Sequence, residues 1–88
     1  LGLVGRAARQ GRIVAVADTV NDPDFLIVAE REGTRAELAV PIVASGRVLG
    51  VLNVEDAAPD AFTADDQHLL ETVADLLARA GIEASGLE

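Results

Sequence analysis

The sequence has no cysteine and no lysine among its 88 residues, and these two absences exclude several kinds of site. Without cysteine the chain forms no disulfide, thiolate zinc site or iron–sulfur cluster, and it has no cysteine nucleophile. Without lysine it has neither a GxxxxGK[ST] phosphate loop nor a Schiff-base lysine. One histidine and two serines leave few nucleophile–base pairs. We therefore expect no catalytic residues, no metal and no cofactor, and predict that the chain is not an enzyme.

Aromatic side chains and positive charge are also scarce. Two phenylalanines are the only aromatics, the net charge is −8, and residues 48–88 carry nine acidic residues against Arg79 alone. Nucleic-acid binding needs a basic surface and stacking platforms, so we exclude it. No apolar run approaches the roughly 18 residues of a membrane span, and no signal-peptide pattern opens the chain. We expect a soluble, cytoplasmic domain with no membrane partner.

Large apolar side chains are few for a self-sufficient domain. Half of the residues are hydrophobic, but 16 of them are alanine, which leaves 28 valines, leucines, isoleucines and phenylalanines. A chain of this length buries only about 60–65% of its unfolded surface. We expect marginal stability and a need for a further segment or a partner chain. Residues 1–86 are expected to form one partial domain, and residues 87–88 are interpreted as an affinity-tag junction.

Apolar spacing predicts the elements of the first third of the chain. A helix over residues 2–9 is expected to end at Gly11, and the β-branched run at residues 13–17 predicts a strand. Residues 21–24 have turn chemistry, because asparagine and aspartate bond their own backbone and proline presets φ. The next run, residues 25–33, fits either a helix or a strand.

Two apolar runs between residues 35 and 55 flank Ala44-Ser45-Gly46 and predict a β-hairpin. A two-residue loop would mix charged and apolar side chains on both faces. A three-residue loop with Gly46 in the left-handed conformation instead pairs Glu37 with Asn53 and separates the faces. One face is then entirely apolar and suited to pack on helices.

The other face of the hairpin carries small residues along its middle and the candidate binding site at one end. Glu37 and Asn53 lie there with Glu55 and Arg35 beside them, and Asp18 ends the neighbouring strand. A mostly apolar concave surface with a few convergent polar groups is what a small-ligand pocket requires. We predict these five residues as ligand-binding. The alternative is a structural cluster in which Arg35 pairs with Glu55 across the strands and Asp18 caps a turn.

A long helix from about residue 64 ends the chain. Thr63 is suited to cap it, and the acidic residues 65 and 66 complement the positive N-terminal end of a helix. Two apolar stripes run along it; they consist of Leu69, Val73, Leu76 and Ala80, and of Leu70, Leu77 and Ala84. One stripe covers a sheet face, so we expect the other to contact a partner helix in a homodimer.

The order of these motifs resembles the later portion of a GAF domain, the small-molecule-sensing module of signalling proteins. The segments that carry the resemblance are GLVGRAARQGRIVAVAD, NDPDF, TRAELAVPIVASGRVLGVLNVED and FTADDQHLLETVADLLA. The resemblance implies an α+β fold with a GAF-like antiparallel β-sheet flanked by helices and a C-terminal amphipathic helix. The fold is expected to be incomplete at its N-terminus, because family members begin with a helix and two strands that these residues do not supply.

The function that the resemblance implies is regulatory. The chain is expected to bind an unidentified small molecule in a bacterial-type signalling protein, to dimerise through its terminal helix, and to pass a signal to an output domain outside this chain. A histidine kinase or a diguanylate cyclase would be such an output domain.

The hairpin also resembles that of the free methionine-(R)-sulfoxide reductases, which show Ser-Glu-[IV] and Gly-Val-Leu-Asp-x-Asp with carboxylates at the substrate. Glu37 matches the first carboxylate, and Asn53 and Glu55 occupy the other two positions. Asparagine at position 53 and the lack of cysteine argue against reductase activity. Two alternatives therefore stand beside sensing: a ligand-free structural dimerisation module, and a degenerate reductase-like protein without catalytic thiols.

Overall fold

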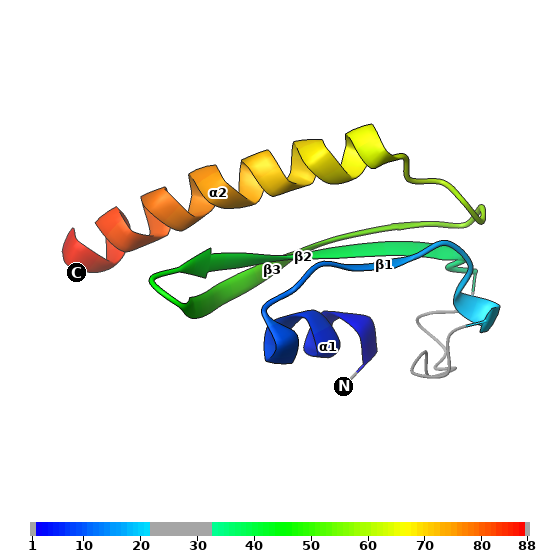
Figure 1. The fold of residues 1–88 in the computed structure, drawn as a ribbon, viewed down its shortest axis with the longest axis horizontal. Coiled ribbons are helices and arrows are strands. Elements are labelled where there is room, and N and C mark those ends of the chain that lie inside the picture. Colours follow the sequence, from blue (N-terminus) through cyan, green and yellow to red (C-terminus); the bar gives the residue numbers. More distant parts are fainter. Residues whose placement is uncertain (1, 22–32, 88) are drawn as a thin grey trace.

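The computed structural model describes the backbone of residues 2–21 and 33–87, and the side chains of residues 2–20 and 33–81. The elements in chain order are α1 (Gly2–Gln10), β1 (Val14–Val16), the 3-10 helix η1 (Thr19–Asn21), β2 (Ala36–Ala44), β3 (Arg47–Asp56) and α2 (Ala64–Leu87). The strands form an antiparallel sheet in the order β1-β2-β3, with α1 against one face and α2 against the other (Figure 1). The predicted α+β class, with an antiparallel sheet flanked by helices, is confirmed. Most of the predicted turn and of the ambiguous run after it lies outside the described residues.

β2 is the central strand, and both of its faces are covered. Its residues 36–41 are all buried, whereas no residue of β3 is fully buried. Leu38 and Val40 pack against Ala74 of α2 on one face. Ala39 packs on the other face against α1. The sheet therefore separates two apolar cores, and β2 contributes to both.

α1 packs on the sheet through Leu3 and Ala7, which are fully buried against Val14 and Ala39. The helix ends as the sequence predicts. Gly11 has a φ of 62°, and its N–H donates to the Ala7 carbonyl at 2.9 Å. A left-handed glycine after the last turn satisfies one of the carbonyls that a helix end leaves without a partner.

The hairpin turn has two residues and not the three that we predict. Ser45 and Gly46 both have positive φ, at 51° and 75°, and Ala44 pairs with Arg47 across them. Positive φ at both central residues is the signature of a type I′ turn, whose twist matches that of the flanking strands. The predicted three-residue loop was therefore wrong.

The extra residue lies in β3, at Leu49. Val43 pairs with Val48, whereas Ile42 pairs with Gly50, so Leu49 has no residue opposite it in β2. This is a β-bulge, and it shifts the register by one residue. The shift restores the side-chain parity that an apolar face requires. From the bulge to the end of the hairpin opposite the turn, the strands therefore have the predicted apolar face and mixed face. The bulge produces this separation, and not an extra residue in the loop.

α2 begins with a reciprocal cap. The Asp66 N–H donates to the Thr63 hydroxyl at 3.1 Å, and the Thr63 N–H donates to a carboxylate oxygen of Asp66 at 2.8 Å. This is a capping box in which aspartate replaces the usual glutamate, and it satisfies two backbone donors. The predicted cap at Thr63 is confirmed. No part of α2 that the structure describes combines the length and the apolar character of a helix that crosses a bilayer.

The side of α2 that contacts the sheet consists largely of small residues. Ala74 and Ala78 are buried there, and Leu70 lies one turn before Ala74 and packs against the same core. The predicted stripe through Leu70 and Leu77 is divided between two environments, because Leu70 packs against the sheet core whereas Leu77 is 42% exposed. Alanine lets the helix approach the sheet closely, and neither predicted stripe contains Ala74 or Ala78.

Candidate functional site

Glu37, Asn53 and Glu55 lie together at one end of the face that α1 contacts. Glu37 of β2 is 1% exposed and lies directly opposite Glu55 of β3, while Asn53 lies opposite Ala39. Glu37 and Asn53 are therefore diagonal neighbours and not the directly opposed pair that the predicted register requires. Diagonal side chains on one face are about 7–8 Å apart, still within reach of a common ligand. The structure thus brings three of the five predicted site residues together.

A short hydrogen-bond chain orders these side chains. The Thr34 hydroxyl donates to one carboxylate oxygen of Glu55 at 2.8 Å, and the Asn53 amide nitrogen donates to the other at 3.1 Å. The remaining polar atom of Asn53, Oδ1, is buried and has no hydrogen-bond partner among the described residues. Leaving a buried acceptor unsatisfied costs about 1–3 kcal/mol. The cluster therefore offers an acceptor that a bound donor would satisfy.

Thr34 also belongs to this cluster, although it was not among the site residues predicted from the sequence. It lies two residues before β2 begins, in the loop that contacts the end of β3. Its position in the quoted segment TRAEL, next to Arg35, is the only sequence signal that could have indicated it.

Asp18 and Arg35 form an ion pair at the edge of the cluster. The Arg35 guanidinium donates two hydrogen bonds to the Asp18 carboxylate, from Nε at 2.8 Å and from Nη2 at 2.7 Å. These hydrogen bonds hold the pKa of the Asp18 carboxyl below its usual value. The predicted alternative, an Arg35–Glu55 pair across the strands, is not formed, because Glu55 accepts from Thr34 and Asn53 instead.

Thr19 reinforces this connection between η1 and the start of β2. Its N–H donates to the Arg35 carbonyl at 2.7 Å, and its hydroxyl donates to the Thr34 carbonyl, also at 2.7 Å. The side chain of Thr19 is buried. These bonds and the Asp18–Arg35 pair fix the backbone from which Thr34 reaches the carboxylate of Glu55.

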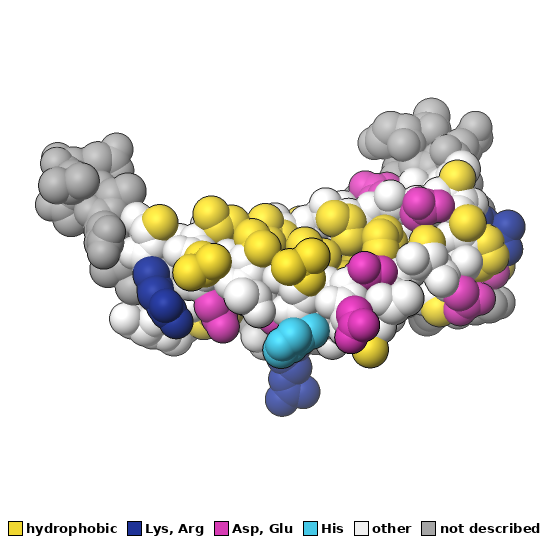
Figure 2. Space-filling model, turned by 90° about the horizontal axis from the view of Figure 1, so that it is seen from above, with side chains coloured by type: hydrophobic (Ala, Val, Ile, Leu, Met, Phe, Trp, Pro, Cys, Tyr) yellow, Lys and Arg dark blue, Asp and Glu magenta, His cyan; other side chains and the backbone are white. Residues whose placement is uncertain are grey.

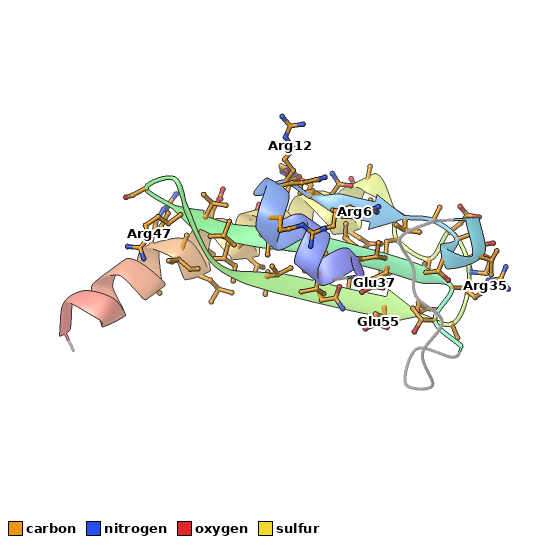
Figure 3. All side chains as sticks on the ribbon, turned by 90° about the horizontal axis from the view of Figure 1, so that it is seen from below. Arg6, Arg12, Arg35, Glu37, Arg47 and Glu55 are labelled. Atoms are coloured by element: carbon orange, nitrogen blue, oxygen red, sulfur yellow. The ribbon has the colours of Figure 1, made fainter. Side chains whose placement is uncertain are left out.

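α1 covers the middle of the hairpin face that was predicted to line a pocket. Leu3 and Ala7 occupy the surface over Ala39, so the small residues predicted to line a pocket pack against a helix instead. Figure 3 shows Glu37 and Glu55 at the end of α1 where the chain begins. The N-terminal end of a helix carries a partial positive charge, which favours nearby carboxylates.

A cavity of about 170 Å³ lies at the same end of the sheet, between β1, the start of β2 and the segment before α2. Glu37 borders it, together with residues that include Asp60, Phe62 and Gln67. The volume is below the roughly 300–1,000 Å³ of typical ligand pockets. Among the described residues, no three histidine, cysteine, aspartate or glutamate side chains are arranged to hold a metal ion. The cluster itself therefore presents carboxylate and amide oxygens that would accept hydrogen bonds from a cationic or N–H donor group.

Comparison with known proteins places these features in a family. The model of the GAF domain family matches residues 1–80. No curated protein sequence matches the chain. Among solved structures, the GAF domain of a phosphoenolpyruvate-protein phosphotransferase from Coxiella burnetii superposes with a TM-score of 0.83 at 25% identity, covering 99% of this chain and 54% of that one.

Two reductases have a similar structure. The type II free methionine-R-sulfoxide reductase from Thermoplasma acidophilum superposes with a TM-score of 0.80 at 28% identity. The match covers 89% of this chain and 54% of the reductase chain. The free methionine-R-sulfoxide reductase from Neisseria meningitidis, solved with its substrate, also superposes with a TM-score of 0.80, at 31% identity. This match covers 89% of this chain and 46% of the reductase chain. The chain thus spans about half the length of the structures that it matches.

These reductases correct one prediction. The scarcity of nucleophiles led us to predict that the chain is not an enzyme, and that inference was wrong, because enzymes are among the structures that share its fold at 28–31% identity. The residue types present in one chain do not decide whether it is an enzyme, since one fold can serve both binding and catalysis. A reductant can also come from another molecule.

Proposed function

Because the chain belongs to the GAF domain family, we propose that it is the small-molecule-sensing module of a bacterial-type signalling protein. The ligand binds at the end of the sheet that carries Glu37, Asn53 and Glu55. The module works in the cytoplasm, dimerises through α2, and passes its signal to an output domain outside this chain, such as a histidine kinase or a diguanylate cyclase.

The observation that carries the proposal is the unsatisfied Oδ1 of Asn53, buried beside two carboxylates on one face of the sheet. The hydrogen bonds that join Thr34, Asn53 and Glu55 use the amide nitrogen of Asn53 and both oxygens of Glu55, and the Asn53 Oδ1 has no partner among the described residues. A bound N–H donor removes the cost of the unsatisfied oxygen. Two carboxylates at adjacent strand positions also favour a positive charge between them.

A primary ammonium group meets both requirements, since it has three donors and one positive charge. The ligand class that we propose is therefore a small amino acid or amine. The 31% identity to a reductase solved with its substrate supports methionine sulfoxide as the first probe. The ligand contacts predicted for Asp18 and Arg35 stay predictions, since each already binds the other.

A thermal-shift titration with methionine-R-sulfoxide tests the proposal, with N-acetylmethionine sulfoxide as the control that lacks the ammonium. Binding stabilises the folded state by about 2.7 kcal/mol at a ligand concentration one hundred times Kd. Asn53→Ala and Glu37→Gln should reduce the shift. Gln10→Ala, which removes an exposed amide at the far end of α1, should not. Equal shifts with the acetylated compound would contradict ammonium recognition.

The absence of any shift, with methionine sulfoxide and a panel of the twenty amino acids, would support the ligand-free alternative. The chain would then be a structural dimerisation module that uses the same α2 contact. Equilibrium sedimentation of the chain without ligand measures that contact separately, so dimerisation and sensing can fail independently.

A second candidate function is sulfoxide reduction, which the likeness to two reductases favours. The chain has no cysteine, so both electrons must come from a thiol outside these residues. One sulfoxide and two thiols then give one thioether, one disulfide and one water. Incubating the chain with methionine-R-sulfoxide and dithiothreitol, and measuring methionine, tests this function. A rate no higher than that of dithiothreitol alone would exclude it for this chain.

A further inference from the structure

The β-bulge in β3 turns the side chain of Leu49 toward α2. Gly50, the next residue, pairs with Ile42, which packs in the core under α2. Side chains alternate along a regular strand, so Leu49 would otherwise point to the side that α1 covers. A bulge places two successive residues opposite one and re-aims a side chain. The bulge therefore explains why Leu49 reaches α2 instead, at Gly81.

Leu49 occupies the space that a side chain at position 81 would need. A Cβ atom added to Gly81 would lie 3.1 Å from the Cδ1 atom of Leu49, which is closer than most such contacts in proteins. Gly81 lies in the interior of α2, which continues to Leu87. Glycine weakens a helix interior relative to alanine. The close approach of Leu49 is the packing reason for a glycine at this position.

The contact between Leu49 and Gly81 holds the end of α2 less firmly than the core holds its middle. Ala74 and Ala78 are 3% and 6% exposed over the sheet, and Gly81 is the next position on the same side. Leu49, however, is 47% exposed, so the contact buries only part of its side chain. Figure 2 shows apolar side chains on the outer surface of α2 as well, but exposed leucines such as Leu76 do not hold the helix to the sheet. A segment with little buried apolar contact opens at a lower cost than the core.

We propose that Leu49 and Gly81 form a latch between the hairpin and the last turns of α2. When Leu49 leaves Gly81, the turns after Gly81 leave the sheet, while the middle of the helix stays packed on Leu38. Glycine makes this the position at which α2 opens with the least loss of helix stability. The latch rests on the proposed signalling function only for its regulatory role, which is to control the direction of the end of α2.

Hydrogen exchange of the backbone amides, measured without ligand, tests the latch. In Leu49→Ala, the amides of residues 82–86 should exchange about fivefold faster than in the native chain, because a partly buried leucine contact is lost. The amides of residues 70–78 should keep their native rates. Val43→Ala is the matched control, because Val43 is similarly exposed, at 41%, and lies opposite Val48, which faces Gly11 on the other side of the sheet. Equal acceleration over the whole of α2, or none after Gly81, would overturn the latch.

A double-mutant cycle gives a second readout that also needs no ligand. Alanine in place of an interior glycine should lower the unfolding equilibrium constant about fivefold through helix propensity. In the native background Gly81→Ala should lose most of this gain, because its Cβ displaces Leu49. In the Leu49→Ala background the full fivefold gain should appear. Equal gains in both backgrounds would overturn the interlock of Leu49 with Gly81, whatever the ligand titration shows.

Discussion

The type I′ turn makes a prediction that separates the observed hairpin from the one expected on sequence grounds. In the structure Ser45 has a φ of 51°, and the residue is exposed. Asparagine tolerates this conformation far better than serine does, and Asn-Gly is the preferred pair for a type I′ turn. Ser45→Asn should therefore stabilise the fold.

The magnitude follows from the cost of the left-handed conformation, about 1–2 kcal/mol for an ordinary residue. Asparagine recovers part of this, so we expect a gain of about 0.5 kcal/mol, or roughly 2–4 °C in Tm for a domain of this size. Gly46→Ala is the matched opposite. No atom lies within 4 Å of the Cβ that it would add, so only the φ of 75° opposes it. We expect a loss of about 1 kcal/mol.

Urea unfolding of the native chain and the two variants measures both changes in the free energy of unfolding. They follow from the transition midpoints, provided that the three proteins share the same dependence of this free energy on urea concentration. In a three-residue loop, Ser45 would have negative φ, and asparagine would bring no gain. A Ser45→Asn protein that is no more stable than the native chain, together with a destabilised Gly46→Ala protein, would refute the two-residue turn. Equal stability of all three would refute the positive φ at both positions.

Three further changes test other parts of the fold. Thr63→Ala removes one half of the capping box with Asp66 and should cost about 1 kcal/mol in urea unfolding, while Thr63→Ser should cost little. Leu38→Ala should cost about 2–5 kcal/mol by the same measurement, because the side chain is 1% exposed in the α2 core. Asp18→Asn removes a carboxylate whose pKa the hydrogen bonds from Arg35 lower. A carboxyl whose pKa is lower in the folded state stabilises the fold at pH values above the pKa of an unfolded aspartate, about 3.9. The native chain should therefore be more stable than this variant at pH 7, and the difference in stability should disappear as the pH falls below about 4.

The sequence was sufficient to predict the elements that depend on local chemistry. Gly11 ends α1 because only a residue that accepts positive φ closes that turn, and Thr63 caps α2 because its hydroxyl reaches the exposed backbone N–H groups. The apolar face of the hairpin also followed from side-chain alternation. These features need no knowledge of distant parts of the chain.

The features that could not be predicted from the sequence depend on contacts between distant segments of the chain. Parity alone does not distinguish a bulge at Leu49 from an extra residue in the loop, because both give the same faces. The ion pair of Asp18 with Arg35 depends on where η1 meets β2, which spacing does not specify. α1 lies over Ala39 because Leu3 and Ala7 need burial, and this closes the middle of a face that looked open on the hairpin alone.

The burial of β2 on both sides has a mechanical consequence. Glu37 belongs to the face with the polar cluster, and the next residue, Leu38, packs against Ala74 of α2 on the other face. The peptide unit that joins them is planar and resists twisting. A displacement of β2 at Glu37 therefore also displaces Leu38, against which α2 packs. A single peptide unit thus connects the polar cluster to the contact with α2.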